Sequence, residues 1–231
     1  MFRKLILAIA TFFLCLIGQT AQAQNSINEQ VFKLCPALSQ KQTYEKDEDF
    51  RYMVAGKDGW IYRTDMDLKT DFELSEWSKL SFERLYKAFK HNGTEVAVMM
   101  IPTRGIVGYT HLLPPYKDKY DQPKAKKGYG KLLSDIENAG YIVANMRDVD
   151  TIPGFFLKRD NHWTAIGAKY AAQRVADAVK KSPVYQTLRK EEFKTDEMAP
   201  EAGDDKANDR FLEFIEEKCK QKIPAETLPA L

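Results

Sequence analysis

The sequence is poor in the residues that most often bind metal ions. Its 231 residues include only three cysteines and three histidines. The histidines, His91, His111 and His162, are far apart, and there is no H-E-x-x-H motif and no closely spaced group of cysteine and histidine. We therefore expect neither a metal site nor a cofactor.

The sequence also lacks a hydrophobic run suited to spanning a membrane. The apolar run near its start, "LILAIATFFLCLIG", falls short of the roughly 20 residues that a spanning helix needs. It follows the positive segment "MFRK" and precedes "AQA", a small-residue cleavage site, so residues 1–23 are typical of a secretory signal peptide cleaved after Ala23. A retained anchor is the alternative. We expect an exported protein with no stable membrane anchor, whose residues 24–231 form one domain.

Neither sign of charge dominates. Lysine and arginine number 35 and aspartate and glutamate 33, and loss of the signal peptide removes Arg3 and Lys4, which leaves the two signs equal. A neutral protein has no general attraction for nucleic acid or for anionic membranes. We therefore expect no nucleic-acid partner, and binding of a polyanion would need a local basic patch.

Two cysteines remain after processing, Cys35 and Cys219. In an exported protein such a pair favours one disulfide, which would close almost the whole domain. Two unpaired thiols, or a bridge to another chain, are the alternatives.

The order of apolar patterns predicts a single α/β domain. "YMVAGKDGWIYRTD" predicts two short strands joined by a turn at Gly56–Gly59, and residues 24–47 are expected to form a loop. Helical spacing predicts helices over "SEWSKLSFERLYKAFKHNG", over residues 124–138, and from Thr164 to about Lys180. The apolar runs "TEVAVMMIP" and "YIVANM" between them are typical of buried parallel strands. This alternation indicates a parallel α/β sheet.

Two groups of cations are candidates for substrate binding, because ligands of open α/β sheets lie beyond the carboxyl ends of the strands. Arg104 directly follows a predicted strand and is a candidate either for holding an anionic or carbonyl group or for a structural ion pair. The segment "KYDQPKAKKGYGK" contains Lys124, Lys126 and Lys127. These lysines are candidates for binding an acidic polysaccharide, and a solvated helix face is the alternative.

The tetrapeptide "DNHW" places Asp160 and His162 two residues apart, just before a predicted helix. A histidine that acts as a base needs one ring nitrogen held by a carboxylate, which fixes its tautomer and stabilises the imidazolium ion. The pair is therefore a candidate for catalysis. A helix-capping aspartate beside a packed histidine would give the same spacing.

Four segments together resemble one known family. "GKDGWIYRTDMDL", "IPTRG", "KGYGKLLSDIENAGYIVANM" and "DNHWTAIGAKYAA" are similar, in this order, to the SGNH-type polysaccharide O-acetyltransferases of bacterial alginate biosynthesis, of the AlgX and AlgJ type. The cleavable signal and the segments around the two cysteines look closer to AlgX, in which the corresponding cysteines are bridged. The resemblance covers most of the chain after the signal peptide.

The resemblance implies a fold, a reaction and a location. The fold would be α/β, an SGNH hydrolase-like three-layer α/β/α domain with a mainly parallel sheet. The reaction would be acetylation of polymannuronate or alginate in the periplasm through a Ser-His-Asp triad. Asp160 would orient the base, and His162 would be that base. Other polysaccharide acetylation and export proteins would be the partners.

One part of the family pattern is missing. The family serine follows the second cysteine in a G-x-S segment, whereas none of the serines in this sequence stands in such a segment: Ser26, Ser39, Ser75, Ser78, Ser81, Ser134 and Ser182. Without a nucleophile no acetyl-enzyme can form. The carbohydrate-binding module of the family is missing as well.

This departure leads to three hypotheses about function. In the first, the chain is an O-acetyltransferase domain that is truncated at its C-terminal end or that receives its serine from another chain. In the second, it is a non-catalytic binding or scaffold protein of the secretion complex. In the third, it is an SGNH-like esterase or acyltransferase for another glycan. Truncation is expected to leave the sheet incomplete, with an unpaired edge and low solubility.

Overall fold

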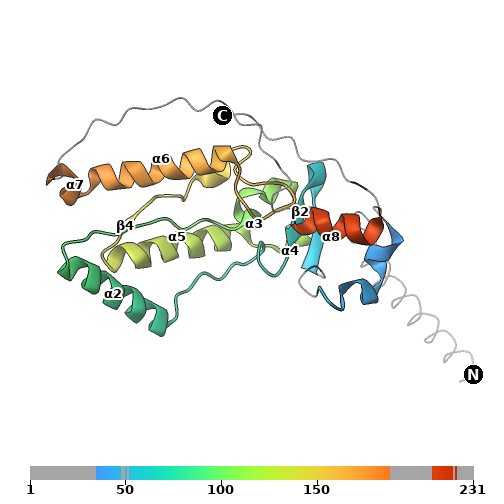
Figure 1. Ribbon diagram of the computed structural model, residues 1–231, viewed down its shortest axis with the longest axis horizontal. Coiled ribbons are helices and arrows are strands. Elements are labelled where there is room, and N and C mark those ends of the chain that lie inside the picture. The colour runs from blue at the N-terminus through green and yellow to red at the C-terminus, as the bar shows by residue number, and fades with distance from the viewer. Residues whose placement is uncertain (1–34, 48–49, 51, 188–209, 221, 223–231) are drawn as a thin grey trace, which may run out of the picture.

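The computed structural model describes residues 35–47, 50, 52–187, 210–220 and 222. The signal peptide expected over residues 1–23 lies outside this part of the chain. In the described part, no helix is long and apolar enough to cross a membrane. Figure 1 shows three layers, in which a pair of strands lies between helix α6 (Ala165–Lys181) and helix α5 (Gln122–Asn138).

The two strands of the middle layer are parallel, as their sequence predicts. Strand β3 (Ala97–Val98) pairs with strand β4 (Ile142–Val143). The backbone N–H of Ile142 donates to the carbonyl of Val96 at 3.0 Å. Both strands are shorter than the apolar runs that predict them, since only two residues of each run form the ladder.

The burial expected for the first of these runs is wrong. Ala97 is exposed, and Val96 and residues 98–101 are only half-buried. The reason is the size of the sheet: among the described residues β4 is the only strand that pairs with β3, so the opposite edge of β3 is open. A strand covered on both sides needs a neighbour on each edge and helices on both faces.

Helix α2 (Glu76–His91) confirms the predicted helix but exposes much of its apolar surface. The Ser75 hydroxyl caps it by accepting the backbone N–H of Ser78 at 3.1 Å. Phe82 and Tyr86 pack against Tyr141, beside β4. On its other sides α2 leaves several large apolar residues exposed, including Trp77, whose exposed fraction is 76%, together with Leu80, Leu85 and Phe89.

Helices α5 and α6 begin and end close to where the sequence predicts. A side-chain oxygen of Asp121 accepts the backbone N–H of Lys124 at 2.9 Å at the start of α5. The chain leaves α5 through Gly140, whose φ of 108° suits glycine because it has no Cβ. The Thr164 hydroxyl accepts the backbone N–H of Gly167 at 3.2 Å and caps α6.

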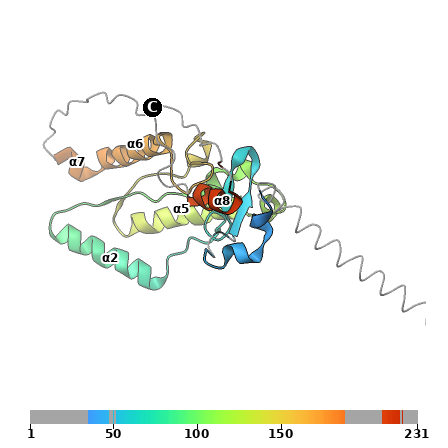
Figure 2. The ribbon, with the colours of Figure 1, turned by 45° about the vertical axis from the view of Figure 1, so that its right-hand side comes forward.

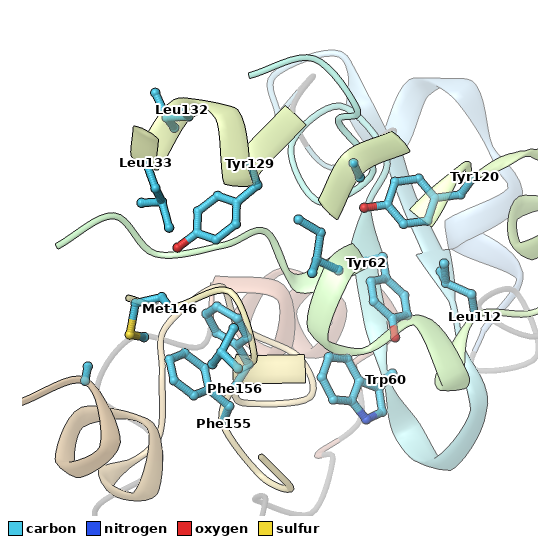
Figure 3. Packing of buried hydrophobic residues seen from close by; sticks show 14 of the residues in the cluster. Trp60, Tyr62, Leu112, Tyr120, Tyr129, Leu132, Leu133, Met146, Phe155 and Phe156 are labelled. Atoms are coloured by element: carbon cyan, nitrogen blue, oxygen red, sulfur yellow. The ribbon is translucent and has the colours of Figure 1, made fainter. Parts of the chain in front are cut away.

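The predicted hairpin is present as strands β1 (Met53–Ala55) and β2 (Ile61–Arg63), paired antiparallel. Both of its faces are buried. Val54 and Tyr62 face the main hydrophobic cluster, which also contains Trp60 and the buried side of α5. Figure 3 shows Trp60 and Tyr62 close to Phe155 and Phe156, which precede α6. Met53 and Ile61 face a second cluster.

The second cluster joins the two ends of the described chain. Helix α8 (Arg210–Cys219) packs there beside the 3₁₀ helices η1 (Pro36–Ser39) and η2 (Lys41–Tyr44), next to the hairpin (Figure 2). A disulfide between Cys35 and Cys219 closes the cluster, with the two Cα atoms 5.4 Å apart. The loop expected before residue 47 is therefore wrong for its described part, because Pro36 begins a 3₁₀ helix and side chains of η2 bond back to η1.

Short elements fill the connections. They are η4 (Lys57–Gly59), α3 (Arg104–Val107), η5 (Tyr109–His111), α4 (Tyr116–Lys119), η6 (Val149–Thr151) and α7 (Pro183–Thr187).

Candidate active site

Asp160 and His162 lie at the tip of a narrow loop between η6 and α6, which we call the site loop (residues 154–164). The two arms of the loop bond to each other. Leu157 donates its backbone N–H to the carbonyl of His162, and Thr164 donates to the carbonyl of Phe155, both at 3.0 Å. Phe156 and Trp163 form an isolated antiparallel bridge between these bonds. The site loop is therefore a small hairpin that holds its tip residues in a fixed position.

The C-terminal arm of the site loop is anchored at the start of α6. The Thr164 hydroxyl, besides capping α6, donates to the carbonyl of Gly154 at 2.5 Å. Gly167 lies against the same loop, where a Cβ atom would overlap the carbonyl of Phe155 and crowd Trp163. Thr164 and Gly167 of the "DNHWTAIGA" segment therefore serve the local packing around Asp160 and His162, which we call the dyad.

The side chains of Asp160 and His162 meet as the sequence predicts. Nδ1 of His162 lies 2.6 Å from Oδ1 of Asp160, and the same oxygen accepts the backbone N–H of His162 at 2.9 Å. Asp160 is 4% exposed, whereas the side chain of His162 is 59% exposed. A buried carboxylate that accepts from Nδ1 leaves Nε2 of a neutral ring with its lone pair, ready to take a proton from a group in solvent.

The second carboxylate oxygen of Asp160 is also buried. Oδ2 has no hydrogen-bond partner among the described residues. Asp160 does not cap α6, because Thr164 holds that position. The geometry therefore favours an aspartate that orients the histidine over a helix-capping aspartate beside a packed histidine.

Arg104 does not reach the surface. It is 1% exposed, and it pairs with Asp67 through Nη1 at 3.0 Å from Oδ2. Its guanidinium also lies 5.0 Å from the ring centroid of Trp60 and 5.4 Å from that of Tyr62. Burial raises the pKa of the Asp67 carboxyl, and the positive charge of Arg104 acts in the opposite direction. Of the two alternatives for Arg104, the structure shows the ion pair, with the side chain buried.

The three candidate lysines lie on the exposed side of α5. Lys126 pairs with Asp150 of η6 at 2.8 Å, a few residues before the site loop. Lys124 and Lys127 are exposed. The same segment contains two further lysines. Lys131 pairs with Asp135 at 2.7 Å, and Lys119 is the last residue of α4. Of the three candidate lysines, Lys126 is therefore the one that the structure places beside the segment leading into the site loop.

Sequence reasoning missed Asp67. It is buried, and its Oδ2 accepts both the backbone N–H of Arg63 at 2.8 Å and Nη1 of Arg104. A second pair of aspartate and histidine was missed as well: Nδ1 of His111 lies 3.0 Å from Oδ2 of Asp58 in the hairpin turn, and the His111 ring stacks on Trp60. In the described part of the chain, no three histidine, cysteine, aspartate or glutamate side chains are grouped as ligands of a metal ion.

Several known proteins are similar to this chain in sequence. A family model for the SGNH hydrolase-like domain of acetyltransferase AlgX matches residues 53–229. The alginate biosynthesis protein AlgX of Pseudomonas syringae pv. tomato is 34% identical over 180 residues, which are 76% of this chain and 38% of that protein. AlgX of Pseudomonas fluorescens is 33% identical over 177 residues, which are 72% of this chain and 36% of that protein.

A solved structure matches the fold. The structure of Pseudomonas aeruginosa AlgX has a TM-score of 0.70 at 26% identity, and the match covers 84% of this chain and 48% of that one. The chain spans between 36% and 38% of the length of the two curated relatives named above. The match confirms the SGNH hydrolase-like α/β fold that the resemblance implied. The chain belongs to the family of the SGNH hydrolase-like acetyltransferase domain of AlgX.

Proposed function

We propose that this domain takes part in the O-acetylation of alginate or a related exopolysaccharide, with Asp160 and His162 as its acid–base pair. The observation that supports the proposal is the contrast within the dyad. The carboxylate is buried and holds Nδ1 at 2.6 Å, while the imidazole that it orients is mostly exposed. A histidine arranged in this way is suited to remove a proton from a hydroxyl group.

The reaction has two acetyl transfers. In the first, Nε2 of His162 takes the hydroxyl proton of a serine as its Oγ attacks the acetyl carbonyl of a donor, and His162 then gives that proton to the leaving group. In the second, His162 takes the proton of a sugar hydroxyl as that oxygen attacks the acetyl-serine, and it returns the proton to the serine Oγ. Asp160 stabilises the imidazolium ion in both steps.

The proposal needs a serine from polypeptide beyond these 231 residues, since no serine in the sequence stands in a G-x-S segment. In the described part of the chain, β4 is the one strand paired with β3, so the other edge of β3 is a candidate position for such a segment. A strand that pairs with β3 would extend the sheet of the middle layer.

Charge supports the proposed substrate class. Lys124 and Lys127 are exposed on α5, and their positive charges can attract the carboxylates of a uronate polymer. The signal peptide expected over residues 1–23 and the disulfide between Cys35 and Cys219 support action in the periplasm.

The decisive experiment is to sequence the gene beyond the codon for Leu231 and to assay any protein that includes a G-x-S segment. The proposal requires such a segment, in the same or in a neighbouring reading frame. A protein that includes it should transfer acetyl groups from a chromogenic ester to polymannuronate, and His162→Ala should abolish the transfer. Acetate released into water from other acetylated glycans, with no transfer to polymannuronate, would favour the esterase hypothesis.

A binding or scaffold role is the second candidate, favoured by the exposed Lys124 and Lys127 of α5, which can attract a polyanion without catalysis. It predicts that the chain retains oligouronate in a pull-down and that His162→Ala leaves retention unchanged. Loss of retention in that variant would exclude a purely binding role.

A further inference from the structure

The guanidinium of Arg104 connects two parts of the fold that are far apart in sequence. Nη1 donates to the carbonyl of Ile61 at 2.8 Å as well as to Asp67. Nη2 donates to the carbonyls of Leu157 and Lys158 at 3.0 and 2.6 Å. Arg104 therefore binds the hairpin with one nitrogen and the site loop with the other.

The two carbonyls of the site loop are close to the dyad. Leu157 and Lys158 precede Asp160 by three and two residues, on the arm of the loop that leads to its tip. Leu157 also bonds across the loop to His162. The hairpin adds a further bond, because the backbone N–H of Ile61 donates to the carbonyl of Lys158 at 2.9 Å. The position of the arm therefore depends on Arg104 and on β2.

This arrangement requires an arginine. Three carbonyl oxygens and one carboxylate oxygen receive the hydrogens of the two Nη atoms in one planar group. A lysine at this position would keep the charge, but its ammonium group has three hydrogens and no planar fork. Its three hydrogens could not serve all four of these acceptors, which are the carbonyls of Ile61, Leu157 and Lys158 and the carboxylate of Asp67.

We propose that Arg104 is a positioning residue for the dyad, which holds the N-terminal arm of the site loop so that the Asp160 carboxylate meets Nδ1 of His162. The catalytic meaning of this role rests on the proposed function. The structural claim does not, because the contact between Asp160 and His162 can be observed in this chain without the G-x-S segment.

The test uses nuclear magnetic resonance on the chain after removal of residues 1–23. A short hydrogen bond between a carboxylate and an imidazole gives a far-downfield Nδ1 proton signal, and the ring nitrogen shifts report the tautomer. Asp160→Asn and His162→Gln assign the signal by removing it. Circular dichroism and thermal unfolding show whether each variant is folded.

Arg104→Lys is expected to fold, to lose the downfield signal or broaden it severely, and to show a mixture of ring tautomers. Two controls separate positioning from stability. Asp67→Asn breaks the same ion pair but leaves the bonds from Arg104 to the site loop, and Ile136→Ala removes a buried side chain of α5. Both should lower the melting temperature and keep the signal.

The proposal is overturned if folded Arg104→Lys keeps the signal at wild-type intensity, or if both controls lose it as well. If Arg104→Lys fails to fold, hydrogen exchange in the wild-type chain tests the proposal instead. In low urea, the Nη hydrogens of Arg104 and the Nδ1 hydrogen of His162 should exchange with solvent in the same opening step, and earlier exchange of the dyad while Arg104 stays protected would refute the role.

Failure of the proposed function would look different. A complete protein without acetyl transfer, whose dyad signal still depends on Arg104, would leave the positioning role intact. In an active protein, Arg104→Lys should lower kcat on the order of 100-fold, with little change in the KM for the polymer.

Discussion

One oxygen of Asp160 accepts two hydrogen bonds from His162, one from the ring at 2.6 Å and one from the backbone at 2.9 Å. The backbone bond fixes the turn between the two residues, and the ring bond fixes the imidazole relative to that turn. These two local bonds orient the base relative to the carboxylate, while the position of the carboxylate depends on the site loop and on the bonds from Arg104 to its N-terminal arm.

In a protein that includes the serine segment, Asp160→Asn should lower kcat on the order of 10⁴-fold, because an amide no longer selects the right tautomer. His162→Ala should cost more, on the order of 10⁶-fold. Release of the acetyl group from a chromogenic donor measures both. Asn161→Ala, at the exposed position between them, is the matched control and should stay within a few-fold of wild type.

Lys124 and Lys127 should contribute to retention of a polyanion. Replacing both by alanine is expected to weaken binding of oligouronate by about two- to thirtyfold, since each exposed contact is worth roughly 0.2–1 kcal/mol. Lys131→Ala on the same helix is the control, because Lys131 is already paired with Asp135. Titrations at two salt concentrations should show a weaker salt dependence for the double variant only. Equal affinity of all three proteins would assign the lysines to a solvated helix face.

Alkaline pH should destabilise the domain. Burial raises the pKa of Tyr120 from the ordinary 10.0 to about 12, and it raises the pKa values of Tyr62 and Tyr129 as well. Above pH 10 the unfolded chain releases phenol protons that the folded chain keeps, so the free energy of unfolding falls as the pH rises. The slope is about 1.4 kcal/mol per pH unit for each such tyrosine.

Urea unfolding at several alkaline pH values checks this slope. Tyr129→Phe should make the slope shallower, although the loss of its hydroxyl bond to the carbonyl of Met100, 2.6 Å long, lowers stability at neutral pH. A free energy of unfolding that does not change between pH 9 and pH 11 would contradict the burial of these phenols.

Removing the disulfide should destabilise the second cluster. The bond spans 184 residues of sequence, and on a loop-entropy model its loss costs up to about 5 kcal/mol. Cys35→Ser combined with Cys219→Ser should unfold at a lower urea concentration, and reductant should shift the wild type to the same midpoint. A wild type that is insensitive to reductant under unfolding conditions would mean that the bond does not form in solution.

Gly167→Ala should lower the stability of the domain, although helices usually favour alanine over glycine. A Cβ atom there would overlap the carbonyl of Phe155, so we expect a loss of about 1–3 kcal/mol. Gly130→Ala in the middle of α5 is the matched control. Its Cβ would meet only the Arg147 side chain at 3.6 Å, so that variant should gain about 0.4–1 kcal/mol. Chemical denaturation measures both, and a stabilised Gly167→Ala would refute the packing of α6 on the site loop.

Features that depend on neighbouring residues could be predicted from the sequence. Asp58 and Gly59 adopt positive φ values of 56° and 81° between two apolar runs, which is local turn chemistry. Asp160 and His162 are close in sequence, so a tight loop can bring their side chains together. The caps of α2, α5 and α6 are local for the same reason.

Features that depend on distant partners could not be predicted. The role of Arg104 depends on residues that are 37 to 54 positions away. The length of β3 depends on which strands pair with it, and these strands cannot be identified from the residues of β3 alone. Helix α8 was missed although Phe211, Leu212, Phe214 and Ile215 have helical spacing, since their partners lie near the other end of the chain.

The hairpin of β1 and β2 separates two hydrophobic clusters. Val54 and Tyr62 pack into the main cluster, and Met53 and Ile61 pack into the second. A strand that is apolar on both faces tolerates no shift in register, because moving by one residue would exchange the contents of the two clusters. The clusters cannot melt separately without exposing one face of the same strands. Helix α8, the 3₁₀ helices η1 and η2 and the site loop should therefore lose their structure in a single cooperative transition.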